Sequence, residues 1–215
     1  MADLRKNVKI YIIESQKDSD ILNKRTEGKA LSASLDLSQI ENQYYQVVTI
    51  EMLEECIKQI CIDISFNRLR ELAIPYLHFS AHGNEEGIVL TDKTFIDWNK
   101  MRLYIDSINL NIGFIKPKPE NPKLILSILN LCFSTCKGIF ARNIQGDLPD
   151  NKYVCIVGPN DAVDWSDSLI AFSTFYHQVF YKHKCGNDAI KNMNFAAGLD
   201  NIFQISMGAG LKLSD

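Results

Sequence analysis

Residues 74–97 read IPYLHFSAHGNEEGIVLTDKTFID, and this stretch decides the fold. Its apolar and aromatic first part, Ile74–Ser80, predicts a buried strand that ends in Ala81-His82-Gly83. The following residues Gly87–Asp97 predict a β-hairpin with its turn at Asp92 and Lys93. One buried strand therefore leads, through a histidine and a glycine, directly into a hairpin.

The segments on either side alternate between strand-like and helix-like patterns. Further strands are predicted by apolar or β-branched runs at Val8–Ile13, Tyr44–Ile50, Leu124–Leu131, Tyr153–Val157 and Phe203–Ser206. Helices are predicted by the spacing of apolar residues at Glu51–Ile62, Trp98–Ile112, Gly138–Ile144, Ser166–Lys182 and Asn187–Ala197. Residues 16–39 predict a long loop with one helical turn, and the prolines within 116–122 predict an exposed connector. The alternation predicts a single α/β domain over residues 1–215, with a mostly parallel sheet covered by helices on both faces.

Composition narrows the class of protein. The chain has 215 residues, 46% of them hydrophobic, which is enough to bury a core without a disulfide or a metal. Its 23 Lys and Arg against 26 Asp and Glu give a formal charge of −3, so a dedicated nucleic-acid binder is not expected. No apolar run reaches the ~20 residues of a membrane span, and Val8–Ile13 predicts a first strand rather than part of a signal peptide. We therefore expect a cytoplasmic protein whose six cysteines are free thiols.

Two strand ends carry residues suited to nucleophilic catalysis. His82 follows the strand Ile74–Ser80, and Cys132 follows the strand Leu124–Leu131. If these strands are parallel neighbours, their ends lie about 5 Å apart, close enough for an imidazole and a thiol to converge. Such a pair is the minimum set for covalent acyl transfer, in which the thiolate attacks a carbonyl and the imidazole protonates the departing amine.

Gly83 suits a site of this kind. Glycine lets the backbone approach a substrate closely. The N–H of Gly83 and the N–H of Cys132 are therefore expected to form an oxyanion hole for the tetrahedral intermediate.

The same residues resemble the caspase-like (clan CD) cysteine peptidases, and among them the CHAT-type branch. The resemblance is carried by Leu77-His78-Phe79-Ser80-Ala81-His82-Gly83-Asn84 with its hairpin, by Asn130-Leu131-Cys132-Phe133-Ser134, and by Tyr153–Gly158 with the helix after it. It covers roughly residues 74–197. The Gln-Ala-Cys-Arg-Gly signature of animal caspases is absent.

The resemblance implies a caspase-like three-layer sandwich with His82 as base, Cys132 as nucleophile, and Gly83 and Cys132 as oxyanion donors. It implies a cysteine endopeptidase that acts on proteins without a metal or an organic cofactor. It further implies a role in prokaryotic antiviral defence or programmed cell death, under the control of an activating protein partner. The charge balance and the lack of a long apolar run, by contrast, are the reasons to expect no direct binding of nucleic acid or membrane.

The resemblance also directs attention to the segment after strand Tyr153–Val157. In relatives this segment lines part of the substrate pocket, and here it carries Asp161, Asp164 and Asp167. Three carboxylates would suit an arginine or lysine side chain of a substrate. The same residues also suit the amino-terminal end of the following helix, so both interpretations stay open.

Several alternatives compete with this interpretation. Cys136 is the rival nucleophile and His78 the rival base, although His78 lies about 13 Å back along its strand from His82. His78, His82, Cys132 and Cys136 together would suit zinc, but residues four apart in a strand do not converge on one ion. A caspase-like interaction module without turnover and a small-molecule acyltransferase with the same dyad remain alternative functions.

Overall fold

The computed structural model describes residues 4–68, 74–112, 127–146 and 151–208. Within these residues, eight strands form one sheet, in which six follow the order β2-β1-β3-β6-β7-β8 and the short strands β4 and β5 extend from β3. Neighbours from β2 to β7 run parallel, whereas β8 is antiparallel to β7. The strands are β1 (Val8–Ser15), β2 (Asn42–Gln46), β3 (Ile74–Asn84), β4 (Gly87–Val89), β5 (Phe95–Asp97), β6 (Asn130–Ser134), β7 (Cys155–Pro159) and β8 (Phe203–Met207).

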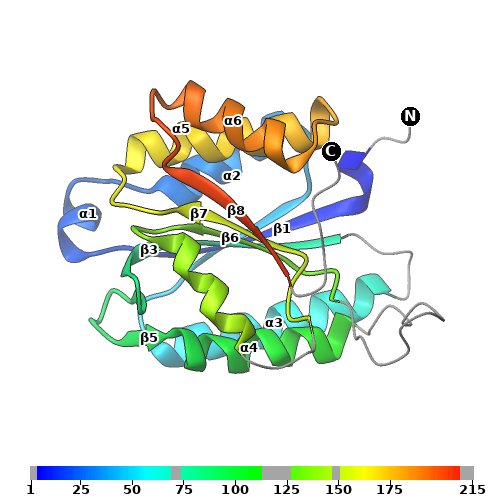
Figure 1. The fold of residues 1–215 in the computed structure, drawn as a ribbon. Coiled ribbons are helices and arrows are strands. Elements are labelled where there is room, and N and C mark those ends of the chain that lie inside the picture. Colours follow the sequence, from blue (N-terminus) through cyan, green and yellow to red (C-terminus); the bar gives the residue numbers. More distant parts are fainter. Residues whose placement is uncertain (1–3, 69–73, 113–126, 147–150, 209–215) are drawn as a thin grey trace.

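Helices cover both faces of this sheet (Figure 1). On one face lie α2 (Glu27–Leu37), α5 (Trp165–Tyr176) and α6 (Gly186–Ala196), and on the other lie α3 (Ile50–Arg68) and α4 (Trp98–Ile112). The short α1 (Asp18–Leu22) projects beyond the carboxyl end of β1. The described residues also include 3₁₀ helices at Leu4–Asn7 and Gly138–Gln145 and a π turn at His177–Tyr181 that continues α5.

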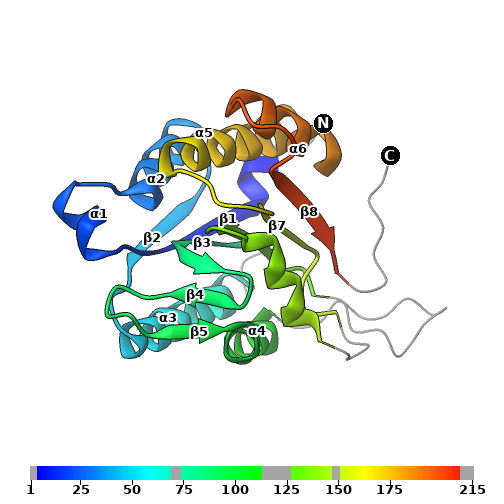
Figure 2. The same ribbon diagram turned by 60° about the vertical axis from the view of Figure 1, so that its left-hand side comes forward.

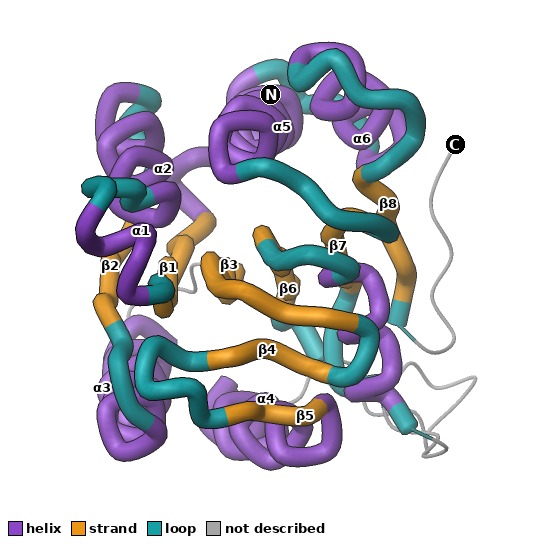
Figure 3. Tube along the Cα trace, turned by 90° about the vertical axis from the view of Figure 1, so that its left-hand side faces the viewer, coloured by secondary structure: helices purple, strands orange, loops and turns teal. Residues whose placement is uncertain are grey.

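Alternate residues of each central strand build two separate cores. In β1, Ile10 and Ile12 face the α2–α5–α6 layer, while Tyr11 and Ile13 face the α3–α4 layer. All four are buried, as expected for a strand covered by helices on both sides. The view along the sheet in Figure 3 shows the three layers, with the strands between the two sets of helices. The predicted α/β class, with a mostly parallel sheet covered on both faces, is confirmed.

The hairpin predicted after the histidine strand is present. β4 and β5 pair antiparallel with Gly87 opposite Asp97, and Lys93 in the turn has a φ of 72°. The hairpin lies on the α3–α4 side of the sheet (Figure 2). Trp98 fastens it to the start of α4, because its indole N–H donates to the carbonyl of Glu85 at 2.7 Å and its ring packs against Phe133.

The prediction of a loop over residues 16–39 is wrong. This segment holds α1 and the full three turns of α2. Leu31 and Leu35 lie one turn apart and pack into the core, and Gly28 allows the helix to approach β1 closely beside Ile12. Two buried leucines in a polar, serine-rich stretch are a weak helical signal, so the helix depends on packing that the local pattern does not reveal.

The strand predicted over Leu124–Leu131 is displaced along the chain. Residues 113–126 lie outside the described part of the structure, which leaves the proline-rich connector 116–122 untested. Within the described part, the strand β6 begins at Asn130 and extends to Ser134. Cys132 is therefore the central residue of this strand rather than the residue that follows it.

Among the helices of the described residues, none is long and apolar enough to cross a membrane.

Candidate functional site

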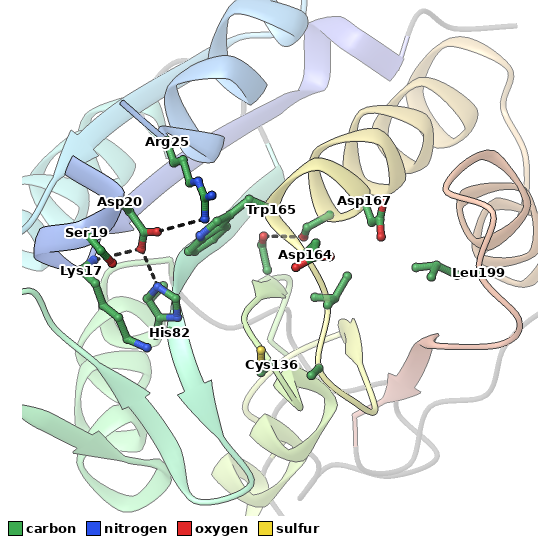
Figure 4. Close-up of a pocket in the computed structure, with 15 residues that line it drawn as sticks. Lys17, Ser19, Asp20, Arg25, His82, Cys136, Asp164, Trp165, Asp167 and Leu199 are labelled. Atoms are coloured by element: carbon green, nitrogen blue, oxygen red, sulfur yellow. Dashed lines mark hydrogen bonds and ion pairs between the residues drawn. The ribbon is translucent and has the colours of Figure 1, made fainter. Parts of the chain in front are cut away.

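A cavity of about 540 Å³ opens at the carboxyl ends of β3 and β6, beside α1 and the start of α5 (Figure 4). In a parallel α/β sheet this is where sites for small molecules and peptides form. It is lined by the β1–α2 connector, the carboxyl end of β3, the end of β6 with the turn after it, the segment from β7 into α5, and the α6–β8 connector. The lining residues are Lys17, Ser19, Asp20, Arg25, Ala81, His82, Ser134, Cys136, Ala162, Val163, Asp164, Trp165, Asp167, Ser168 and Leu199.

His82 faces the cavity from the end of β3, as predicted. Its Nε2 lies 2.6 Å from Oδ2 of Asp20, which α1 carries into the site. The ring of Trp165 packs edge-on against the imidazole, with 5.1 Å between the ring centroids. One nitrogen of His82 is therefore engaged by a carboxylate, and one side of its ring is in contact with an indole (Figure 4).

Asp20 is buried and well supplied with donors. The backbone N–H of Lys17 donates to Oδ2 at 3.3 Å, and an Arg25 nitrogen lies 4.0 Å from Oδ1. Burial alone would raise the pKa of Asp20, but this effect is outweighed by hydrogen bonds from His82, Lys17 and Trp165 and by the charge of His82. The pKa of Asp20 consequently lies below its usual value, and the carboxyl group is ionised at neutral pH.

Cys136 is the cysteine that shares the cavity with His82. It lies two residues beyond the end of β6, in a turn that leads into the 3₁₀ helix Gly138–Gln145. Lys137 adopts a left-handed conformation with a φ of 59°, and its N–H donates to the carbonyl of Asp161 at 3.1 Å. Gly138 packs so closely on the backbone of Phe133 that a Cβ would meet its carbonyl oxygen at 2.6 Å. These contacts fix the turn that carries Cys136.

Cys132 does not line the cavity. Its side chain is fully buried and faces the α2–α5–α6 layer, where it contacts the hydroxyl of Tyr176. Burial raises the pKa of its thiol far above the ordinary value, and the hydrogen bond from Tyr176 only partly opposes this effect. A central position in a covered strand leaves the thiol without access to a substrate, so the predicted role of Cys132 as nucleophile conflicts with its placement.

The predicted pair of oxyanion donors is also divided. Gly83 follows the lining residue His82 but is not itself among the lining residues; its backbone packs so closely on Thr135, the residue before Cys136, that a Cβ would collide with the Thr135 hydroxyl. The backbone of Cys132, in contrast, lies between β3 and β7, with His78 and Val157 as its partners in the two ladders. Its N–H therefore lies within the sheet. Cys136 follows the last ladder pair of β6, so its N–H is outside the sheet.

The three aspartates of the segment after β7 have different positions. Asp164 and Asp167 line the cavity, whereas Asp161 is exposed, is not among the lining residues, and accepts from the N–H of Ala162. The residue at the amino-terminal cap of α5 is Asp164, although its side chain makes no capping hydrogen bond. Two of the three predicted pocket residues thus lie on the cavity.

A second polar cluster lies beneath the cavity, inside the fold. Nδ1 of His78 is 3.0 Å from the hydroxyl of Tyr176, and its Nε2 is 3.8 Å from a carboxylate oxygen of Glu27. His78 and Cys132 are direct partners across β3 and β6, while His82 and Cys136 lie at the cavity. The four residues considered for zinc therefore fall into two separate sets, and no group of three ligand-type side chains suited to a metal occurs among the described residues.

Sequence reasoning missed Asp20, Arg25 and Trp165. The first two lie in the segment predicted as a loop, where nothing in the local pattern connects them with a histidine 62 positions away. The topology could have indicated Asp20 and Arg25. In a parallel sheet, the connector that follows the first strand starts at the same edge of the sheet as the carboxyl ends of the other strands. Trp165 stands within the quoted aspartate segment but carries no motif of its own.

A scan against models of known protein families finds no match for this chain, and a search among curated proteins also finds none.

Proposed function

We propose that this protein is a cysteine endopeptidase in which Cys136 is the nucleophile and His82 the general base and acid. The observation that carries the proposal is the convergence of both side chains on one cavity from the ends of neighbouring parallel strands, β3 and β6. The alternative thiol, Cys132, is buried in the sheet, whereas Cys136 is the cysteine that lines the cavity. The rival base, His78, is fully buried as well.

The chemistry is that of acyl transfer through a thioester. The Cys136 sulfur attacks the scissile carbonyl carbon while its proton passes to His82, and the carbonyl oxygen takes up the negative charge. Collapse of this intermediate breaks the C–N bond, and the proton on His82 goes to the departing amine. Water then hydrolyses the thioester by the same two steps. The N–H groups of Gly83 and Cys136 are the proposed oxyanion donors, because Cys136 lines the cavity, Gly83 follows the lining residue His82, and both lie beyond the last parallel ladder pairs of their strands.

The order of elements supports a caspase-like, CHAT-type relationship. The histidine strand β3, the hairpin β4–β5, the cysteine strand β6 and the strand β7 with helix α5 follow each other as the resemblance implies. We carry forward from this resemblance a cytoplasmic enzyme of prokaryotic defence or programmed cell death that a protein partner activates. His82 and Cys136 line the same cavity, and no hydrogen bond is found between them among the described residues; hydrogen bonds of a catalytic pair often tighten only in the substrate complex.

The cavity supports a substrate with a basic side chain. Asp164 and Asp167 lie on its α5 side, whereas the cationic residues Lys17 and Arg25 come from the β1–α2 connector on the opposite side. Arg25 is also paired with Asp20. A guanidinium or ammonium group of the residue before the cut would find two carboxylates there. Asp161 is not included in this proposal.

Two cysteine variants test the proposal. A thiol-directed peptide electrophile with Arg or Lys at its first position is expected to label wild type and Cys132→Ala, and to spare Cys136→Ala. Comparison of new protein amino termini in cells that express wild type or Cys136→Ala then identifies the substrate and the residue before the cut. The Cys132→Ala variant is the matched control, because it removes a thiol four residues away that does not line the cavity.

The opposite pattern would contradict the assignment. Labelling that persists in Cys136→Ala and disappears in Cys132→Ala would return the reaction to the buried cysteine. A protein that binds a partner but labels at neither thiol, with that partner present, would instead be an interaction module without turnover.

A further inference from the structure

The carboxylate of Asp20 is more buried, and held by more contacts, than a carboxylate in a surface ion pair. Its side chain is only 5% exposed, and Oδ2 lies 2.6 Å from Nε2 of His82. The same carboxylate accepts from the backbone N–H of Lys17, and a nitrogen of Arg25 lies 4.0 Å away. A buried carboxylate with several donors is held in one position, and in low-dielectric surroundings its charge acts strongly on the group it faces.

This contact decides which nitrogen of His82 is free. Asp20 is ionised and can only accept, so the proton of a neutral His82 lies on Nε2. Nδ1 then carries the lone pair. The edge-on contact with Trp165 adds a second restraint on the imidazole, so that rotation about its side-chain bonds would lose contacts on both sides.

We propose that Asp20 is a positioning residue for His82, and that the active site is therefore a Cys136–His82–Asp20 arrangement; this inference rests on the proposed function. When the S–H bond of Cys136 breaks, the proton goes to Nδ1 of His82 and the sulfur electrons form the new bond to the carbonyl carbon. Nε2–H remains donated to Asp20, whose charge stabilises the imidazolium. When the C–N bond breaks, the Nδ1 proton leaves with the amine, and Asp20 itself exchanges no proton.

Asp20, His82 and Trp165 come from three different elements of the fold. It is delivered by α1, in the connector between β1 and α2, while His82 comes from β3 and Trp165 from the start of α5. Three parts of the chain that lie far apart in sequence thus meet at one imidazole (Figure 4). A movement of α1 would alter the orientation of His82 without touching Cys136.

The test measures how the rate of Cys136 alkylation by iodoacetamide depends on pH, read by mass spectrometry of the Cys136 peptide from the intact chain. In wild type the imidazole takes the thiol proton, so alkylation continues on the acidic side of an ordinary thiol titration. In Asp20→Asn the amide can donate to Nε2, which moves the proton of neutral His82 to Nδ1 and removes the stabilising charge. We expect the rate at about pH 6 to fall by 10-fold or more, and turnover of a peptide substrate by about 10²- to 10⁴-fold. Asp20→Glu keeps a carboxylate and is expected to recover part of both losses.

Two controls separate the possible outcomes. Asp18→Asn removes an exposed aspartate of the same helix, α1, that does not line the cavity, and it is expected to leave the alkylation profile unchanged. His82→Ala is expected to shift the profile at least as far as Asp20→Asn. If His82→Ala shifts the profile and Asp20→Asn does not, Asp20 serves only the fold and the inference is overturned. If neither variant shifts it, the proposed dyad itself fails.

A measurement on the wild-type protein keeps the inference testable even if Asp20→Asn does not fold. Nitrogen NMR of the histidine-labelled chain at about pH 9, where a free imidazole is neutral, reports which ring nitrogen carries the proton. His82→Ala assigns the signal. A proton on Nε2 is expected, and a proton on Nδ1 would overturn the inference.

Discussion

Gly83 lies where the chain has no room for a side chain. A Cβ at this position would collide with the hydroxyl of Thr135 and would lie 2.7 Å from the carbonyl oxygen of Gly87. The first obstacle is the end of a side chain, but the second is backbone of the hairpin strand β4, which pairs with β3 at this point. The close approach brings the backbone of β3 against the residue that precedes Cys136, so the packing of Gly83 and the geometry of the site are linked.

Gly83→Ala is therefore expected to lower the free energy of unfolding by about 1–3 kcal/mol, the usual cost of overpacking, and to reduce activity by more than the loss of folded protein explains. Urea unfolding and peptide cleavage at a temperature where the variant is folded measure the two effects. Adding Thr135→Ala removes one of the two collisions and should recover only part of the stability. A Gly83→Ala variant with wild-type stability and activity would show that the close approach has no functional role.

Glu14 contributes a dependence of stability on pH. It is buried at the end of β1, where it accepts from the N–H of Gly28 at 2.9 Å and the hydroxyl of Tyr44 at 2.6 Å. Burial raises the pKa of its carboxyl group above 4.5, and the hydrogen bonds from Tyr44 and Gly28 only partly oppose this effect. The folded protein thus binds the Glu14 proton more tightly than the unfolded chain does.

The sign follows from that difference. The contribution of Glu14 to stability is complete below about pH 4.5 and is lost as the pH rises through the folded-state pKa. Relative to wild type, Glu14→Gln should therefore become progressively more stable as the pH rises above about 4.5, as measured by urea unfolding at several pH values. The exposed Glu86→Gln is the control, expected to stay within about 0.5 kcal/mol of wild type. A stability difference between Glu14→Gln and wild type that stays constant with pH would contradict the burial argument.

At the scale of elements, α2 depends on tertiary packing. Leu31 is completely buried between the helix and the sheet, whereas Leu37 at the end of the same helix is 88% exposed. We expect Leu31→Ala to cost about 2–5 kcal/mol of unfolding free energy and Leu37→Ala less than about 0.5 kcal/mol. Urea unfolding of the two variants, identical in chemical change, measures the difference. Equal costs would mean that α2 does not pack on the sheet as described.

The elements also show where sequence reasoning succeeds. The helix over Trp98–Ile112 and the hairpin before it are found with the predicted limits, because a strong helical period and turn residues act locally. The helix α2 was missed, and β6 was predicted too early, because their limits depend on what covers them. The position of β6 bears on the site, because it places Cys132 inside the strand, where it is buried, and Cys136 at the cavity.

At the scale of the whole molecule, one sheet joins the two helical layers, because the α2–α5–α6 layer packs on one of its faces and the α3–α4 layer on the other. Each covered strand supplies alternate residues to both cores, as Ile12 and Ile13 do in β1. Loss of either layer would expose one face of the same strands to water. Elements from both faces of the sheet contact the strand that carries His82. The hairpin strand β4, on the α3–α4 side, pairs with the end of β3, and Trp165 of α5, on the other side, contacts the His82 ring.

This coupling predicts one cooperative unfolding transition. The chain has two tryptophans, and they report on different layers: Trp98 is buried with the α3–α4 core, while Trp165 begins α5. In Trp165→Phe the fluorescence follows Trp98 alone, and in Trp98→Phe it follows Trp165 alone.

Each variant is compared with its own far-UV circular dichroism in urea, so a general loss of stability in one variant does not affect the comparison. We expect the two signals to have the same midpoint in both variants, as a two-state domain requires. A Trp165 signal that changes at lower urea than the circular dichroism would mean that the α5 side opens first, and the site would then lie on a separately unfolding layer.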